Sequence, residues 1–244
     1  MATEQEAIAR PAGEGEEGPK RALVISAHPD DADIGAGGTA ALWSREGWEF
    51  YYLICTDGSK GSEDPEMTAE KLVPLRRIEQ RAAAAALGVK EVFFLDNVDG
   101  ELAYTKELMR DVVRHIRRLR PYAVFSHHPN QLVQNMFVNH PDHRCAGTVA
   151  LDAVYPMARN RPSFPELLEE GLESFSVKEV YLWSASDPDF EVDITSVVDL
   201  KFGALKEHKS QFAEIEERMG RWRERWSEPD GRFLERFRRI QFPF

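Results

Sequence analysis

Cysteine, long apolar runs and excess positive charge are all lacking in this 244-residue chain. Its two cysteines, Cys55 and Cys145, are too few for a disulfide framework, so we expect buried, reduced thiols. No apolar run approaches the roughly 20 residues that cross a bilayer, and the N-terminal stretch does not have the pattern of a signal peptide. The net charge of −11 disfavours contact with nucleic acid or anionic lipid. We therefore predict a cytoplasmic protein with no nucleic-acid partner and no membrane span.

The two ends of the chain differ in composition from the middle. Residues 1–20 are rich in Glu, Gly, Ala and Pro without apolar periodicity, which predicts a disordered tail. Residues 21–244 are expected to form a single domain, ending in a basic, aromatic segment over about 212–244. We expect this segment to be an amphipathic helix whose aromatic side chains dock on the domain. A subunit contact or a substrate lid is the alternative.

Short apolar runs alternate with helical patterns along the domain. Strands are predicted over residues 22–26, 50–55, 92–95, 122–126, 177–183 and 190–194, and helices over 39–46, 69–87, 106–119, 140 to about 158, and 196 to about 211. This alternation indicates an α/β fold of the Rossmann-like three-layer α/β/α type with a mainly parallel sheet. In such folds, ligands bind at the carboxyl ends of the strands.

An imidazole and three carboxylates follow the first predicted strand. They belong to His28, Asp30, Asp31 and Asp33, on a loop that Pro29 stiffens. Carboxylates this close repel one another, so we expect a bound cation or a set of hydrogen-bond donors to hold them. His28 and Asp31 are three residues apart and can both face one ion, which leaves Asp30 free to act as a base.

A second cluster, NHPDHR at residues 139–144, follows the fourth predicted strand and opens a helix. If the first and fourth strands are neighbours in the sheet, His143 comes within reach of His28 and Asp31. A His-Asp-His set with an open position for water is typical of catalytic zinc, whereas closed structural sites are usually rich in cysteine. The sequence therefore predicts one Zn²⁺ per chain in a hydrolytic site.

The two clusters together resemble the LmbE/PIG-L family of zinc-dependent N-acetylglucosaminyl deacetylases. The resemblance is carried by HPDD at 28–31 and HPDH at 140–143, which are specific in combination. Further similarity follows in the family's order at TDG 56–58, RRIE 76–79, LGV 87–89, DGEL 99–102, Leu205 and HKSQ 208–211. It spans residues 22–211, and within the family the pattern is most similar to the diacetylchitobiose deacetylases.

The resemblance implies a role for most residues of the two clusters. It implies a metal bound by His28, Asp31 and His143, with Asp30 as the general base and His140 as the electrophile or acid. An acetamide is a poor electrophile, so its hydrolysis needs polarisation of the carbonyl and activation of the water. The implied reaction is removal of the acetyl group from an N-acetylglucosamine-type sugar or glycoside, a small N-acetylated amino-sugar substrate.

Three further residues have implied supporting roles. Asp142 would orient His140 and keep it protonated. Arg76 and Asp99 correspond to residues that the family uses on substrate hydroxyls, although an arginine on a charged helix or an aspartate before glycine commonly has no such role.

Two other functions stay open on the sequence alone. A zinc amidase acting on a sugar-linked thiol conjugate would use the same metal ligands, with its specificity set by residues 130–139, Arg76 and Asp99. A nucleotide-binding Rossmann module is the alternative of another class, because GAGG at 35–38 follows the first strand and Asp57 ends the second. The neighbouring carboxylates argue against a bound pyrophosphate. The sequence leaves formation of a homo-oligomer open.

Overall fold

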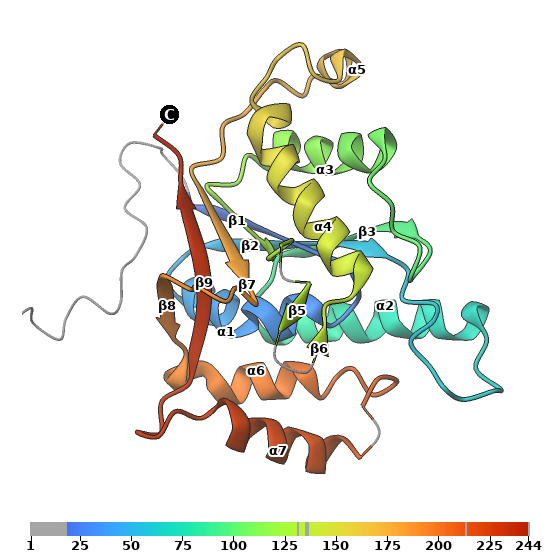
Figure 1. The fold of residues 1–244 in the computed structure, drawn as a ribbon, viewed down its shortest axis with the longest axis vertical. Coiled ribbons are helices and arrows are strands. Elements are labelled where there is room, and N and C mark those ends of the chain that lie inside the picture. The colour runs from blue at the N-terminus through green and yellow to red at the C-terminus, as the bar shows by residue number, and fades with distance from the viewer. Residues whose placement is uncertain (1–18, 131, 135–136, 213, 244) are drawn as a thin grey trace, which may run out of the picture.

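The centre of the structure is a seven-stranded sheet with helices packed on both of its faces (Figure 1). The computed structural model describes residues 19–130, 132–134, 137–212 and 214–243. The tail predicted over residues 1–20 therefore lies outside the described residues except at its last two positions. The predicted Rossmann-like three-layer α/β/α fold with a mainly parallel sheet is confirmed.

The strands of the large sheet lie in the order β3-β2-β1-β4-β7-β9-β8. Their bounds are β1 (Arg21–Ser26), β2 (Glu49–Thr56), β3 (Glu91–Asn97), β4 (Ala123–His127), β7 (Glu179–Trp183), β8 (Phe190–Asp193) and β9 (Leu234–Gln241). Neighbours from β3 to β7 pair in parallel, whereas β9 is antiparallel to both β7 and β8. Two short strands, β5 (Val133–Gln134) and β6 (Phe137–Val138), form a separate antiparallel pair.

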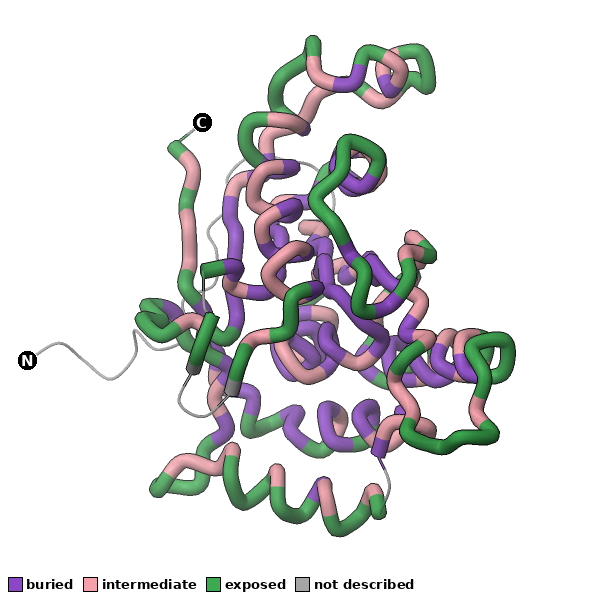
Figure 2. Tube along the Cα trace, turned by 45° about the vertical axis from the view of Figure 1, so that its right-hand side comes forward, coloured by how far each residue is buried: buried purple, intermediate pink, exposed green. Residues whose placement is uncertain are grey.

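The helices cover the sheet in two groups. The helical elements are α1 (Asp31–Arg45), α2 (Ala69–Ala86), α3 (Lys106–Leu119), α4 (Pro141–Asp152), a π-helix (Ala153–Ala158), α5 (Pro165–Glu169), a 3-10 turn (Thr195–Val197), α6 (Val198–Leu205) and α7 (Ile215–Trp226). One apolar cluster unites α1, α2, α6 and α7 with the sheet, and the other unites α3, α4 and α5 with it. Figure 2 shows the central strands largely buried and α7 largely exposed. Within the described residues, no helix combines the length and hydropathy needed to span a bilayer.

The continuous apolar run of β1 reflects burial on both faces of the sheet. Successive side chains of a strand point to opposite faces. Ala22 and Val24 accordingly pack in the cluster with α1, and Leu23 and Ile25 pack in the cluster with α3. All four are fully buried, as expected for a central strand of a parallel sheet.

The helix after β1 begins earlier than the sequence predicts. A helix was expected over 39–46 after a glycine-bearing loop, but α1 spans Asp31–Arg45 and contains all three glycines of the GAGG stretch. These glycines allow close packing: a Cβ on Gly35 would lie 2.5 Å from the ring of Trp183, and one on Gly38 would lie 2.5 Å from Ile194. They are therefore not a phosphate-binding loop ahead of a helix, and this contradicts the nucleotide-binding alternative.

The C-terminal segment is a helix followed by a strand, so the prediction of one amphipathic helix is wrong for its second half. The helix α7 ends at Trp226, whose ring stacks on Phe202 with 5.6 Å between centroids. The strand β9 then inserts between β7 and β8. Glu235 and Phe237 are buried while Arg236 and Arg238 are exposed. This alternation has the period of two expected for a strand, but the many arginines obscure it in the sequence.

The helix predicted over 196–211 is also shorter, because α6 ends at Leu205. Glu79 of α2 accepts hydrogen bonds from the backbone N–H and the hydroxyl of Ser210, at 2.8 and 2.6 Å. This contact draws residues 206–211 out of the helix and against α2.

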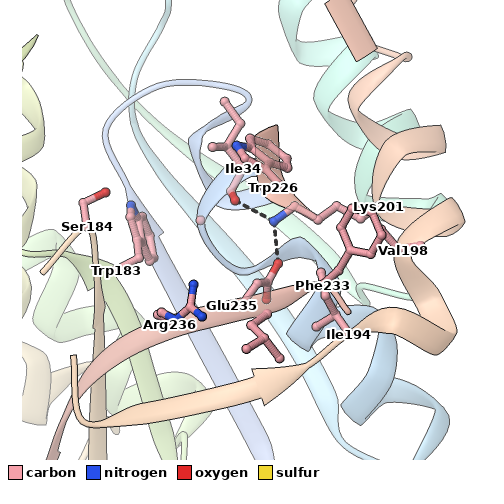
Figure 3. Close-up of a pocket in the computed structure, with 12 residues that line it drawn as sticks. Ile34, Trp183, Ser184, Ile194, Val198, Lys201, Trp226, Phe233, Glu235 and Arg236 are labelled. Atoms are coloured by element: carbon pink, nitrogen blue, oxygen red, sulfur yellow. Dashed lines mark hydrogen bonds and ion pairs between the residues drawn. The ribbon is translucent and has the colours of Figure 1, made fainter. Parts of the chain in front are cut away.

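A buried ion pair joins α6 to the C-terminal strand β9, and both of its members bind the backbone of α1 (Figure 3). Lys201 Nζ lies 2.5 Å from Glu235 Oε1 and donates to the carbonyl oxygen of Ile34 at 2.7 Å. The Glu235 carboxylate also accepts hydrogen bonds from the backbone N–H groups of Gly38 and Thr39. The side chains of Lys201 and Glu235 are only 4% and 5% exposed. The pair therefore fixes α1 against α6 and β9.

We predict that Lys201→Met destabilises the fold, because it leaves the Glu235 carboxylate buried without its cation. The free energy of unfolding, measured by urea denaturation, should fall by about 3 kcal/mol. Lys206→Met is the matched control, because the partner of Lys206 is the exposed Glu216 and its loss should leave stability nearly unchanged. Equal stability of the two variants would contradict the importance of the buried pair.

Candidate active site

The loops after β1 and β4 bring the two sequence clusters together. The two strands are parallel neighbours, as the prediction required, and α4 begins at the second cluster. His28 Nδ1 lies 3.2 Å from Asp31 Oδ2, and His143 Nε2 lies 3.2 Å from both His28 Nδ1 and Asp31 Oδ1. The two imidazoles meet through one nitrogen each, and Asp31 faces each of them with a different carboxylate oxygen. We call these three side chains, His28, Asp31 and His143, the donor triangle.

The spacing of the donor triangle suits a tetrahedral metal site. With metal–ligand bonds of 2.0–2.1 Å, two ligands of a tetrahedral zinc ion are about 3.3 Å apart. The 3.2 Å between His28 Nδ1 and His143 Nε2 matches this value, and Asp31 has one oxygen 3.2 Å from each of these nitrogens. Two imidazoles and one carboxylate, with a fourth position left for water, are also a suitable set for zinc. The residues of the site therefore fit a bound metal ion.

The charges around His28 favour a cation at the same place. His28 Nε2 lies 3.1 Å from Asp99 Oδ1 and 3.2 Å from Asp142 Oδ2, on the side of the ring away from Asp31. Burial disfavours the charged imidazole, yet hydrogen bonds to Asp142, Asp31 and Asp99 raise the pKa of His28 to about 12. A site that holds a proton this strongly has an excess of negative charge, which a metal ion would neutralise.

His127, to which the sequence analysis assigned no role, lies against the donor triangle. Its Nε2 is 3.4 Å from Asp31 Oδ2, and its ring stacks on His143 with 4.2 Å between centroids. Asp31, His127 and His143 could therefore form a second metal-binding group. Its position at the end of β4 was visible in the sequence, but a strand-end histidine alone cannot be ranked as a ligand.

The hydrogen bonds of His127 argue against direct metal binding. Burial and the nearby His143 lower the pKa of His127 to about 4, so the ring is neutral and carries one proton. Trp183 Nε1–H faces its Nδ1 at 3.1 Å, and the N–H of Ala27 faces its Nε2 at 3.2 Å. Nε2 either carries the proton or accepts from Ala27, so in both tautomers it has no free lone pair for a metal. His127 instead supports Asp31 from outside the donor triangle.

Asp30 lies beside the donor triangle without being part of it. Its backbone has φ of +101°, which is unusual for a residue with a side chain, and such strained residues cluster at functional sites. Arg76 Nη2 lies 3.2 Å from Asp30 Oδ2. Burial raises the pKa of Asp30 to about 6, with Arg76 opposing this shift and Asp31 adding to it. The carboxyl group can therefore exchange a proton close to neutral pH.

Asp142 has different partners from those predicted. We expected it to orient His140, but its carboxylate contacts His28 and accepts hydrogen bonds from the N–H groups of Gly100 and Leu102 at 2.7 and 3.2 Å. These N–H groups belong to the loop after β3, which lies over the start of α4. Asp142 thus supports His28 and joins two loops of the site.

His140 is held as a hydrogen-bond donor, though without the charge that we expected. It caps α4, and its Nδ1 accepts from the backbone N–H of Asp142 at 3.2 Å. Burial and the neighbouring His28 lower the pKa of His140. The neutral ring therefore carries its proton on Nε2.

Arg76 and Asp99 both border the site. Arg76 is 3% exposed, and its guanidinium also donates to the carbonyl oxygens of Pro29 and Gly58 at 2.5 and 3.0 Å. A Cβ on Gly58 would lie 2.6 Å from Arg76 Nη1, so glycine is needed there for the arginine to fit. Asp99 contacts His28 through one oxygen and accepts from the backbone N–H of Lys60 through the other.

Comparisons with known proteins point to the same part of the chain. Residues 23–154 match the family model described as PIG-L: GlcNAc-PI de-N-acetylase. A diacetylchitobiose deacetylase from Thermococcus kodakarensis is 37% identical over 196 residues, which cover 80% of this chain and 71% of that protein. The structure of N,N'-diacetylchitobiose deacetylase from Pyrococcus horikoshii is similar with a TM-score of 0.82 and 33% identity, covering 91% of this chain and 84% of that chain.

One structural relative has a different reaction. GalB, the 4-carboxy-2-hydroxymuconate hydratase from Pseudomonas putida KT2440, has a TM-score of 0.74 and 27% identity, covering 92% of this chain and 97% of that chain. Proteins with this fold and comparable identity therefore differ in the bond to which they add water, and the site residues have to decide the reaction.

We predict that zinc binding depends on His28 far more than on His127. His28→Ala removes one corner of the donor triangle and should abolish stoichiometric zinc binding, measured by competition with a chromophoric chelator. His127→Phe removes only support for Asp31 and should weaken zinc binding by roughly 10- to 100-fold. His128→Phe, at the next position, serves as the control. Zinc retained by His28→Ala and lost by His127→Phe would instead assign the metal to Asp31, His127 and His143.

Proposed function

Because the chain belongs to the PIG-L family of de-N-acetylases, we propose that it is a zinc-dependent hydrolase that removes the acetyl group from an N-acetylglucosamine-type sugar or glycoside. One Zn²⁺ per chain would be held by His28, Asp31 and His143. The observation that carries the proposal is the donor triangle, whose side chains approach one another to 3.2 Å, together with an adjacent carboxyl group, Asp30, that is not part of it. A metal site paired with a separate base is what amide hydrolysis requires.

The residues around the donor triangle divide the chemistry of hydrolysis between them. When bound, zinc would polarise the acetamide carbonyl and lower the pKa of a water molecule to roughly 7. Asp30 accepts a proton from the attacking water as the new carbon–oxygen bond forms. His140 donates a hydrogen bond from Nε2 to the carbonyl oxygen as that oxygen gains negative charge. The carbon–nitrogen bond then breaks, and Asp30, which holds the proton taken from the water, delivers it to the leaving sugar amine.

Arg76 and Asp99 are proposed to contact the hydroxyl groups of the substrate. Arg76 also binds Asp30 and the backbone of Pro29, so it fixes the base as well as bordering the site. Substitution of Arg76 should consequently lower kcat in addition to raising KM. Substitution of Asp99 should weaken substrate binding and also remove a hydrogen-bond partner of His28.

The alternatives differ in the bond that is attacked. A zinc amidase acting on a sugar-linked thiol conjugate would use the same donor triangle, and only the substrate can separate it from a sugar deacetylase. The GalB relative is named as a 4-carboxy-2-hydroxymuconate hydratase, and its TM-score and identity to this chain are lower than those of the Pyrococcus deacetylase. The similarity to two diacetylchitobiose deacetylases favours the N-acetyl sugar.

We predict that zinc-loaded protein releases amine from N-acetylglucosamine or its β-linked dimer, and that Asp30→Asn lowers kcat by roughly 100- to 10,000-fold because it removes the proton acceptor. The variant should retain zinc, since Asp30 is outside the donor triangle. Amine release is measured with an amine-reactive fluorophore, and the exposed Asp187→Asn is the control.

Two outcomes would contradict the proposal. If wild-type protein with stoichiometric zinc releases no amine from either sugar but hydrolyses a sugar-linked thiol conjugate, the amidase alternative is correct. If it adds water to 4-carboxy-2-hydroxymuconate instead, the chain shares the reaction of its hydratase relative.

A further inference from the structure

Three fully buried polar side chains from separate parts of the chain meet behind Asp30. Asp33 lies on α1, Gln80 lies on α2, and His208 follows α6. Asp33 Oδ2 accepts a hydrogen bond from Gln80 Nε2 at 2.8 Å and lies 2.8 Å from His208 Nε2. All three residues are outside the donor triangle, and each has 0% exposure. Buried polar groups at this density are stable only when their hydrogen bonds are satisfied together.

Gln80 connects this cluster to the backbone of Asp30. Its Oε1 accepts a hydrogen bond from the Asp30 N–H at 2.7 Å, and its Nε2 donates to Asp33. Because the two ends of an amide have opposite hydrogen-bonding character, these contacts fix the orientation of the side chain. His208 Nε2–H donates to the Asp33 carboxylate, because a carboxylate oxygen 2.8 Å away can only accept, and His208 Nδ1 is buried without a hydrogen-bond partner among the described residues.

The backbone of Asp30 needs such a restraint. Its φ of +101° is unfavourable for any residue with a side chain, and it persists only when the surroundings hold it. Arg76, one helical turn before Gln80 on the same face of α2, holds the Asp30 carboxylate. The helix α2 therefore binds Asp30 twice, at the side chain through Arg76 and at the backbone through Gln80.

We propose that Gln80, Asp33 and His208 are positioning residues that hold Asp30 in its strained conformation, so that its carboxylate faces the site beside the donor triangle. This inference rests on the proposed function, in which Asp30 is the general base. It also gives a role to the HKSQ stretch at 208–211, which the proposed mechanism does not use: His208 binds Asp33, and Ser210 is fastened to α2 by Glu79.

The inference is tested by Gln80→Met, which keeps the size of the side chain and removes both hydrogen bonds. We expect kcat to fall roughly 10- to 100-fold because the base is misplaced, with KM changed by less than about threefold and zinc content unchanged. Leu72→Met, a substitution of a buried residue elsewhere on α2, is the matched control and should leave kcat unchanged. A fall in kcat that matches a loss of bound zinc or of folded protein would overturn the inference.

Substitution of His208 provides a second arm with a rescue. His208→Met removes the donor to Asp33, and His208→Gln keeps a side-chain N–H that can replace it. We expect the glutamine variant to recover most of the kcat that the methionine variant loses. Gln80 and His208 bind the same oxygen of Asp33. The fold reduction in kcat of the Gln80→Met/His208→Met double variant should therefore be smaller than the product of the fold reductions of the two single variants. Equal losses in the methionine and glutamine variants, or simple multiplication in the double variant, would count against a shared role.

Amide hydrogen exchange of Asp30 tests the restraint on its backbone independently of catalysis, and so separates this inference from the proposed function. The Asp30 N–H, followed by NMR, should exchange with solvent slowly in wild-type protein and at least roughly tenfold faster in Gln80→Met, with or without zinc. Wild-type protein that shows this protection but releases no amine from N-acetyl sugars would refute the proposed function and leave the restraint on Asp30 established. Equal exchange in both proteins would refute the restraint itself.

Discussion

The repulsion among carboxylates at the carboxyl edge of β1 and β4 is the constraint on which the rest of the site depends. Asp31, Asp99 and Asp142 all lie within 3.2 Å of His28, and Asp30 is next to Asp31 in the chain. No arrangement of these groups is stable in a buried position without positive charge or donated hydrogen bonds. Each nearby element supplies one or the other: Arg76 reaches Asp30, the loop after β3 gives its N–H groups to Asp142, and the donor triangle has room for a metal ion.

The fold provides the rigidity that this crowded site requires. The helix α1, which begins with Asp31, is held along its length by side chains from elements distant in sequence. Glu235 and Lys201 bind its middle, and Trp183 packs against Gly35 near its start while also contacting His127. The C-terminal strand is thus connected to the site through α1, although none of its residues is near the donor triangle in sequence.

The sequence was sufficient for the parts of the site that are local or follow from strand order. HPDD follows β1 directly, HPDH begins α4 after the segment that follows β4, and the pairing of β1 with β4 brings the two motifs together. It was insufficient where a contact joins distant segments. The partners of Asp142, the tautomer of His127 and the cluster of Asp33, Gln80 and His208 depend on which side chains meet in space, and no spacing rule encodes that. Likewise, the glycines of α1 resembled a loop because the side chains that pack against them are distant in the chain: the Trp183 ring that requires Gly35 is almost 150 residues away.

The most direct test of the account is a titration of metal-free protein with zinc while amine release from N,N'-diacetylchitobiose is followed. If the donor triangle is the catalytic centre, activity should be absent at the start, rise in proportion to added zinc and reach its plateau at one ion per chain. Amine release that does not depend on zinc, or no release from protein that has bound one zinc ion per chain, would contradict the assignment of this chain as a zinc-dependent deacetylase.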